Sequence, residues 1–192
     1  MAQEDLAALG DAELIALACA GNPAAYGVVV RRYSALAIRT AALLGAGADA
    51  EDVAQEAFVK AYRSLGRFRP GSSFRPWLLT IVTNEAHNRH RSSRRRADRE
   101  IRPGVDLPAA GPDELAESAE RRAAVRAALE QLPTAQREVL VCRFLLDLDE
   151  RETAQVLRLA PGTVKSRTSR GLRRMRPGLA SLGSTEEVGH GR

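Results

Sequence analysis

The stretch DAEDVAQEAFVKAYRSLGRF, residues Asp49–Phe68, has the spacing of a single amphipathic helix. Asp49 is expected to cap this helix and Gly66 to close it, so that it spans Ala50 to Leu65. Apolar side chains that recur every three or four residues form one stripe along a helix. In this stretch the stripe consists of Val53, Ala57, Phe58, Ala61, Tyr62 and Leu65. The stretch therefore predicts a helix that packs in a helical domain.

Composition favours helices in the rest of the chain as well. Alanine and leucine dominate the 192 residues and no alternating strand pattern is sustained, so we expect an all-α protein. A hydrophobic content of 44% with 28% charged residues fits a soluble chain of one or two small domains. No window of about 18 apolar residues is present, and the acidic start lacks the order of a signal peptide. We therefore expect no membrane insertion and a cytoplasmic location.

Residues that start and end helices divide the chain further. Asp11 and Asn22 are expected to act as N-caps, and Asp149 with Glu152 forms the pattern of a capping box. A stretch with three prolines and two glycines, Ile101–Pro112, is typical of a linker, and the polar tail 179–192 is expected to be disordered. The other expected helices are Asp11–Cys19, Pro23–Leu43, Phe74–Arg96, Asp113–Leu132, Ala135–Leu146, Asp149 to near Leu157, and Pro161–Met175.

The net charge of +5 is unevenly distributed. Residues 1–56 hold eight acidic and three basic side chains, whereas residues 153–185 hold seven basic and no acidic ones. A second basic block, Arg89–Arg102, has seven bases against two acids. An acidic front with two basic blocks indicates one protein partner and two contacts with polyanions. The alternative is that the basic blocks are solvated helix faces.

The last two expected helices have helix-turn-helix spacing, because about four residues join them and the second opens with Pro161. Val164, Thr168 and Leu172 repeat every four residues and are expected to pack inward. The second helix can enter the major groove of duplex DNA, where backbone amides approach phosphates and basic side chains reach base edges. Its outward side chains would be Lys165, Ser166, Ser169, Arg170 and Arg173.

Three of the eight aromatic residues, Phe68, Phe74 and Trp77, flank a loop that contains Gly71, Ser72 and Ser73. An unpaired base stacks on a flat π surface, so the loop is a candidate site for single-stranded DNA. Amide and basic side chains of the next helix can bind base edges and phosphates: Asn84, His87, Asn88, Arg89 and Arg91. The alternative is that Phe74 and Trp77 anchor the loop in the core, and a partly buried Trp77 could do both.

The sequence contains no pattern typical of an enzyme or a metal site. It has no HxH motif, no Walker loop and no Ser/Cys–His arrangement, and the acids between Asp49 and Glu56 lie on one helix without partners. Cys19 and Cys142 are far apart and are expected to be buried rather than bonded to a metal or to each other. We therefore expect no catalytic residues, no cofactor and no metal.

Two ordered blocks of the sequence resemble bacterial sigma factors. Asp49–Phe68 followed by SFRPWLLTIVTNEAHNRHR, Ser73–Arg91, resembles sigma regions 2.2 to 2.4. LPTAQREVLVCRFLLDLDERETAQVLRLAPGTVKSR, Leu132–Arg167, resembles region 4. The layout, with no further domain between them, is similar to that of the extracytoplasmic-function (ECF) sigma factors. It implies region 2 at residues 1–100, a flexible linker at 101–112 and region 4 with its helix-turn-helix at 113–178.

The resemblance implies a promoter-specificity subunit that binds core RNA polymerase, recognises −35 and −10 elements and promotes strand opening. It implies contacts with the β′ clamp helices and the β flap of polymerase, and an anti-sigma factor is a common antagonist in the family. Polymerase contacts are implied for Asp49, Asp52, Gln55, Glu56 and Phe58. Contacts with −10 DNA are implied for Arg69, Gly71, Ser72, Ser73, Phe74, Trp77, Asn84, Asn88, Arg89 and Arg91. Contacts with −35 DNA are implied for Thr163, Lys165, Ser166, Arg167, Ser169, Arg170 and Arg173.

Two positions depart from the family pattern. Arg158 stands where a glycine in a left-handed turn is usual, and Thr153 stands where an apolar residue is usual. Two other interpretations remain open. An ordinary helix-turn-helix regulator would use Leu132–Arg176 but would leave the Asp49 helix and the aromatic loop without a role. A nucleic-acid enzyme would need catalytic residues that the sequence does not offer.

Overall fold

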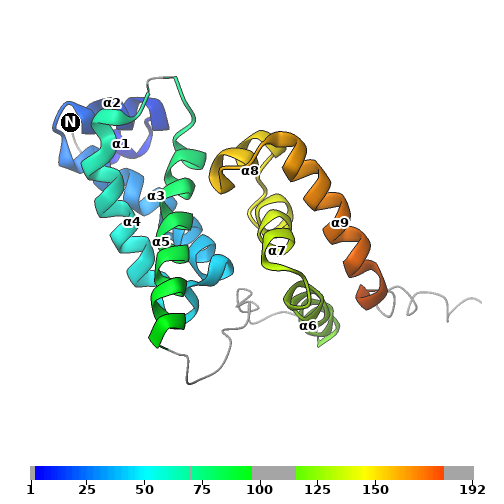
Figure 1. Ribbon diagram of the computed structural model, residues 1–192. Helices are drawn as coiled ribbons and strands as arrows, with labels where there is room; N and C mark the ends of the chain where they lie inside the picture. The colour runs from blue at the N-terminus through cyan, green and yellow to red at the C-terminus, as the bar shows by residue number, and fades with distance from the viewer. Residues whose placement is uncertain (1–2, 70, 97–115, 180–192) are drawn as a thin grey trace, which may run out of the picture. The chain divides into compact units, whose positions relative to one another are not determined.

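The computed structural model describes residues 3–69, 71–96 and 116–179, and every regular element in these ranges is a helix (Figure 1). The chain divides into two compact units, Met1–Ile101 and Arg102–Arg192. The expected all-α fold with two helical domains is thereby confirmed. The expected linker and the tail from residue 180 onward lie outside the described residues.

The first unit is built around a central helix, α3, which packs against α2, α4 and α5 (Figure 1). A π turn, η1, and a 3-10 turn, η2, join α3 to α4, and a second 3-10 turn, η3, follows α4. The bounds in this unit are α1 (Gln3–Ala7), α2 (Asp11–Cys19), α3 (Pro23–Ala41), η1 (Ala42–Ala46), η2 (Gly47–Asp49), α4 (Ala50–Ser64), η3 (Leu65–Arg67) and α5 (Phe74–Arg96).

Helices α4 and α5 lie side by side and each buries one stripe (Figure 1). The buried residues of α4 follow the stripe predicted from the sequence with one exception. Tyr62, at the edge of the stripe, is 44% exposed, although its ring contacts that of Tyr26. The apolar first half of α5 turns Leu78, Val82 and Ala86 completely into the core. These two stripes fix which residues of α4 and α5 remain at the surface.

The expected caps are partly confirmed. The Asn22 side chain accepts hydrogen bonds from the backbone N–H groups of Ala24 and Ala25, at 3.1 and 3.2 Å. The expected cap at Asp11 is wrong, and Asp49 occupies the N-cap position of α4 without a side-chain capping hydrogen bond. Gly10 occupies the N-cap position of α2, and the Asp11 carboxylate is instead engaged by side chains of α3. Asp49 is the last residue of the 3-10 turn η2 and has φ −86° and ψ 12°, not the extended backbone that directs a capping side chain toward the helix.

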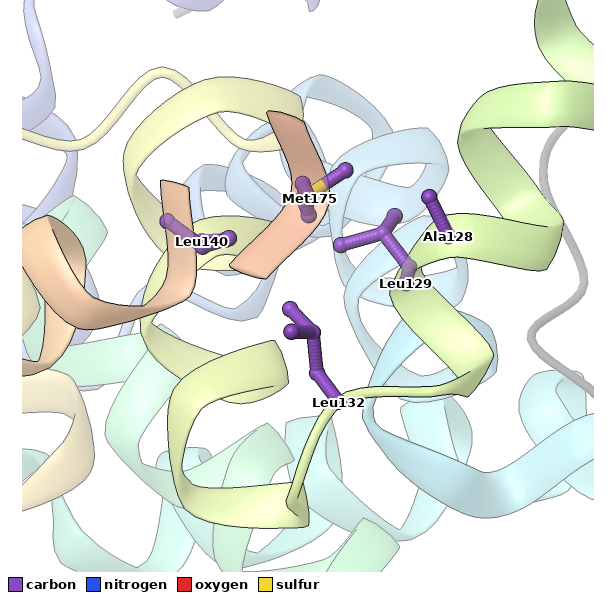
Figure 2. Packing of buried hydrophobic residues seen from close by; sticks show 5 residues of the cluster. All are labelled: Ala128, Leu129, Leu132, Leu140 and Met175. Carbon is purple, nitrogen blue, oxygen red and sulfur yellow. The ribbon is translucent and has the colours of Figure 1, made fainter. Parts of the chain in front are cut away.

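The second unit has two apolar clusters that hold both ends of its last helix. In Figure 2, Ala128, Leu129 and Leu132 face Leu140 and Met175. The other cluster joins Val139, Ala154 and Val164, one residue from each of three helices. The elements of this unit are α6 (Ala116–Glu130), α7 (Thr134–Leu140), a π turn η4 (Val141–Leu145), α8 (Glu150–Leu157) and α9 (Pro161–Leu179). The start of α9 is therefore held by α7 and α8, and its later turns by α6 and α7.

The inward side of α9 differs from the expected one at a single residue. Val164 is buried and Thr168 is half-buried, but Leu172 is 45% exposed. The stripe continues instead through Gly171 and Met175, which keeps the helical spacing of three and four residues. A Cβ added at Gly171 would lie 2.9 Å from Leu140 Cδ1, so this glycine lets α9 approach α7 closely.

Helix α8 begins with a confirmed capping box and ends at a strained arginine. Asp149 Oδ1 accepts from the Glu152 N–H at 2.7 Å, and Glu152 Oε2 accepts from the Asp149 N–H at 3.0 Å. Arg158 ends α8 with φ 52° and ψ 48°, the left-handed conformation that glycine adopts most easily. Thr153 is fully buried, and its Oγ1 has no hydrogen-bond partner among the described residues. The two departures from the family pattern thus belong to α8, Thr153 inside the helix and Arg158 at its C-cap.

We predict that Arg158→Gly stabilises the second unit, because it removes the steric cost of a side chain in the left-handed region. Glycine makes the unfolded chain more flexible, which offsets part of the gain and leaves roughly 0.5–1 kcal/mol. The measurement is thermal unfolding of the full chain followed by circular dichroism.

The matched control is Arg151→Gly, at an exposed position inside α8, which should lower the stability by about 1 kcal/mol. Unfolding temperatures that fall in both variants would show that the left-handed turn carries no strain.

Candidate protein and nucleic-acid interfaces

The exposed side of α4 presents Asp52, Gln55, Val59 and Tyr62, which we call the α4 face. All four side chains are exposed and are spaced by three and four residues. Val59 is 50% exposed, so an apolar patch follows the polar first turns of the helix. The sequence predicts Asp52 and Gln55 but misses Val59 and Tyr62. The sequence does contain a signal for Val59: its position lies outside the apolar stripe of α4, so its aliphatic side chain points to solvent.

Phe58 is not available to a protein partner in this structure. Its side chain is buried, and its carbonyl oxygen accepts a 2.6 Å hydrogen bond from the Tyr26 hydroxyl. Burial raises the pKa of Tyr26 far above its usual range, so this hydroxyl stays protonated and donates. The expected role of Phe58 as a polymerase contact is therefore corrected to a core role.

Ion pairs link α4 to α5 and involve residues that were assigned to different partners. Arg89 reaches Glu56 at 3.1 Å and Asp49 at 3.9 Å, and Lys60 pairs with Glu85. The Arg89, Glu56 and Asp49 side chains are about a third to a half exposed, so each pair is worth at most about 1 kcal/mol. Arg89, expected at −10 DNA, thus lies beside two acids that were expected to bind protein.

The loop before α5 is anchored by an aromatic cluster of Tyr33, Phe68, Phe74 and Trp77. Phe74 is its centre, because its ring centroid lies 5.5 Å from Tyr33, 5.8 Å from Phe68 and 5.5 Å from Trp77. Phe74 is only 3% exposed, so its ring offers no open face to a base. Its expected DNA contact is corrected to an anchoring role. Phe68 and Trp77, 5.2 Å apart, are half-buried and keep part of their rings at the surface.

The loop and one side of α5 carry most of the residues that were expected to contact −10 DNA. Arg69, Gly71, Ser72 and Ser73 are exposed, and Gly71 has φ 82°, which only glycine adopts without strain. Trp77, Ile81, Asn84, Asn88 and Arg91 follow at spacings of four and three residues, and we call them the α5 face. Arg91 donates a 2.9 Å hydrogen bond to the Asn88 side-chain oxygen. Ile81 was not predicted, whereas Arg89 lies outside this face.

Helix α9 presents Ser166, Ser169, Arg170 and Arg173 opposite its buried stripe, and we call these four the α9 face. Ser166 is half-buried and the others are exposed. Arg170 donates to the backbone oxygen of Ser166 at 3.2 Å and to its Oγ at 3.1 Å, which holds the guanidinium against the helix. Lys165 is exposed at one edge of the face, while Thr163 and Arg167 at the other edge are half-buried.

The described residues contain no cluster of histidine, cysteine and acidic side chains that could hold a metal ion. Cys142 is buried as expected, and burial raises the pKa of its thiol to about 12, which makes it unreactive. Cys19 is exposed, contrary to expectation, and its Sγ lies 3.7 Å from the Leu65 carbonyl oxygen. Within residues 3–69, 71–96 and 116–179, no helix has the length and apolar character needed to cross a membrane.

Both units match known protein families. Residues 29–96 match Sigma-70 region 2, and residues 122–175 match Sigma-70, region 4. The sigma factor CnrH of Cupriavidus metallidurans is 32% identical over 170 residues, which cover 83% of this chain and 89% of that protein. The ECF sigma factor SigM of Mycobacterium tuberculosis is 34% identical, with coverage of 86% and 82%. The ECF sigma-E factor of Escherichia coli K12 is 32% identical, with coverage of 84% and 90%.

Solved structures agree with these matches. CnrH in complex with the cytosolic domain of CnrY superposes with a TM-score of 0.67 at 28% identity, covering 89% of this chain and 97% of that one. The sigma factor RpoE of Bartonella quintana, in complex with the anti-sigma factor NepR, gives 0.66 at 26% identity, covering 79% and 94%. With region 2 in its first unit and region 4 in its second, the chain belongs to the ECF RNA polymerase sigma factors, the promoter-specificity subunits that act in transcription initiation.

Proposed function

We propose that the first unit binds both core RNA polymerase and the −10 element, and that the second unit reads the −35 element. The α4 face would take the polymerase clamp helices, the loop and the α5 face would take −10 DNA, and the α9 face would enter the −35 major groove. One observation carries this division: the three exposed faces differ in chemistry. The first is acidic and apolar, the second aromatic with amides, and the third is serine and arginine.

The α4 face supports a protein contact rather than a nucleic-acid contact. Its polar end carries Asp52, which phosphates would repel, and its other end is apolar. Protein interfaces concentrate their binding energy in a few well-packed side chains, and tyrosine is among the most frequent of these. Val59 and Tyr62 therefore extend the contact that the sequence assigned to Asp52 and Gln55.

The loop and the α5 face support binding of an unpaired strand. The partly exposed rings of Phe68 and Trp77 adjoin a glycine-serine loop that a DNA backbone can approach closely. Stacking of one base on an aromatic ring is worth roughly 1–3 kcal/mol, whereas extruding a base from a duplex costs a few kcal/mol. The two quantities nearly cancel, so the isolated chain should open little DNA and polymerase must supply the rest.

The α9 face supports readout of duplex DNA. Arginine side chains bind guanine with two hydrogen bonds, and each such pair discriminates against a wrong base by roughly 1–3 kcal/mol. The absence of acidic side chains from residue 153 to 179 leaves the phosphate attraction of this helix unopposed. The bonds from Arg170 to Ser166 restrict the arginine before DNA arrives.

A protein antagonist is a second partner class that we propose for this chain. CnrH and RpoE were each solved with a second protein, the cytosolic domain of CnrY and the anti-sigma factor NepR. The second unit offers exposed apolar side chains, Phe144 and Leu172, to a protein such as the β flap of polymerase or an anti-sigma factor. We further propose that the chain is non-catalytic and acts with polymerase in the cytoplasm.

Run-off transcription with purified core polymerase tests the proposal as a whole. Specific transcripts should appear from genomic DNA fragments only when the chain is added, and their starts map the −10 and −35 elements. A helix-turn-helix regulator would add no transcripts to core enzyme alone, which would overturn the proposal. Cleavage of DNA on addition of magnesium would instead favour a nucleic-acid enzyme.

We predict that Val59→Glu weakens binding to core polymerase by about 30-fold, because it places a charge in an apolar contact worth about 2 kcal/mol. Replacing Asp52 and Gln55 by alanine should act in the same direction. Binding is measured by fluorescence anisotropy of labelled chain titrated with core enzyme.

Ala35→Glu provides the matched control, since it introduces the same charge at an exposed position of α3. Equal loss of polymerase binding in both variants would contradict the assignment of the α4 face. Binding of the −35 duplex should be unchanged in all of these variants.

We predict that Arg170→Ala with Arg173→Ala lowers affinity of holoenzyme for the mapped −35 duplex by 10-fold or more, from loss of one or two base contacts. Polymerase binding should remain intact. The salt dependence of duplex binding should also become shallower, because fewer phosphates are neutralised.

Arg174→Ala is the control, since Arg174 is exposed on α9 but lies outside the α9 face. A loss in this control equal to that in the double variant would mean that charge alone, not the α9 face, binds the duplex.

A further inference from the structure

The buried hydroxyl of Tyr33 ties the start of α2 to α3. It donates a hydrogen bond to Asp11 Oδ2, and the other oxygen of this carboxylate lies 2.5 Å from Arg32. Arg32 also donates to the carbonyl oxygens of Ala7 and Leu9, at 3.2 and 2.9 Å. Asp11 is therefore held from two sides, and it in turn fixes the position of the Tyr33 hydroxyl.

The ring of Tyr33 carries this constraint to the loop. It meets Phe74 edge-on, with ring centroids 5.5 Å apart and planes at 66°. Phe74 is the first residue of α5, directly after the exposed Gly71–Ser73 loop, and its ring also contacts Phe68 and Trp77. A continuous series of contacts thus leads from Asp11, through two buried rings, to the partly exposed rings beside the loop.

The hydroxyl group is not needed to fill space at this position. A phenylalanine would supply the same ring, and the desolvation of a hydroxyl must be compensated by a hydrogen bond. Burial raises the pKa of Tyr33 far above its usual range, and the hydrogen bond to Asp11 raises it further, so the hydroxyl remains a donor. What the hydrogen bond adds is a fixed tilt of the ring, because an edge-on contact depends on the angle between the two rings.

We propose that Asp11 and Tyr33 are positioning residues for −10 recognition: their hydrogen bond orients the Tyr33 ring, which fixes Phe74 and thereby the direction in which the loop and Trp77 meet an unpaired base. This inference rests on the proposed function of the loop. Neither residue belongs to the sequence-predicted contacts with DNA. Asp11 lies 60 positions before Gly71 in the sequence, so only the folded unit connects Asp11 to the loop through contacts.

Trp77 gives a direct test, because it is the only tryptophan in the chain. Tyr33→Phe keeps the ring and removes the hydroxyl. In this variant we expect acrylamide quenching of Trp77 emission to change at least two-fold. We also expect holoenzyme affinity for an oligonucleotide, the nontemplate strand of the −10 element mapped by run-off transcription, to fall three- to ten-fold. Affinity for core polymerase and for the −35 duplex should stay within two-fold of the original.

Tyr26→Phe is the matched control, since it removes another buried tyrosine hydroxyl of α3, one that donates to Phe58 instead. Tyr26→Phe should lower the stability of the chain about as much as Tyr33→Phe does. It should leave Trp77 quenching and oligonucleotide affinity unchanged. Asp11→Asn retains an acceptor for Tyr33 and should restore most of the affinity that Asp11→Ala loses. The double variant Tyr33→Phe with Asp11→Ala should bind the oligonucleotide no more weakly than Asp11→Ala alone, because both changes break the same hydrogen bond.

The outcomes separate this inference from the proposed function. If the original holoenzyme does not bind the oligonucleotide, the proposed −10 role of the loop is wrong and the inference falls with it. If the original holoenzyme binds and Tyr33→Phe behaves like Tyr26→Phe, only the positioning role is overturned. If Tyr33→Phe fails to fold, the comparison of Asp11→Ala with Asp11→Asn tests the positioning role by the same two measurements, Trp77 quenching and oligonucleotide affinity. Equal values in these two variants would overturn it.

Discussion

The packing of Leu78, Val82 and Ala86 against the neighbouring helices holds α5 in one rotational setting, and everything else in the first unit depends on that setting. A helix turns by about 100° per residue, so a slip of one position would carry Asn84 and Asn88 away from solvent. Burying a side-chain amide without partners costs free energy, and exposing leucine and valine adds to that cost. The same apolar contact that stabilises the unit thus selects the polar surface that a ligand can reach.

A comparable constraint operates in the second unit through a residue without a side chain. Gly171 brings α9 so close to Leu140 that a Cβ would meet it at 2.9 Å, and Val164 and Met175 extend the contact on either side. This close approach turns the α9 face outward and leaves Leu172 at the surface. The rotation of α9 is therefore set by a glycine on the opposite side from Arg170 and Arg173.

The sequence predicts the helices well because their signals are local. The capping box at Asp149 and the cap at Asn22 involve residues two or three apart, and both are confirmed. Asp11 and Asp49 show the limit of such signals. The Asp11 carboxylate is engaged by Arg32 and Tyr33, which lie more than 20 residues away, and no local pattern announces that competition.

The same limit applies to the expected site residues. Phe58 and Phe74 lie in segments that carry a candidate interface, yet only tertiary packing decides that their rings are buried while Val59 and Tyr62 are exposed. Arg89 has the helical spacing of a DNA contact, but its position between two helices brings it to Glu56 and Asp49. A four-residue repeat leads from Val164 to Leu172, and a seven-residue step leads from Val164 to Gly171. The sequence alone does not show that Gly171, rather than Leu172, makes the close contact with α7. Sequence therefore predicts the segments that carry a candidate interface more reliably than it predicts which of their side chains are exposed.

The three exposed faces are individually weak, and their value comes from being carried by one chain. In the proposed function, base stacking on Trp77 would barely offset the cost of extruding a base, and exposed arginine contacts would lose strength with salt. Once the α9 face held duplex DNA and the α4 face held polymerase, the loop would act on DNA at a high effective concentration. A chain that opened DNA by itself would open it anywhere. Weak stacking by a well-oriented loop instead restricts opening to sites where the other two contacts are already made, and orientation of the loop by buried aromatic rings is what keeps so weak a contact selective.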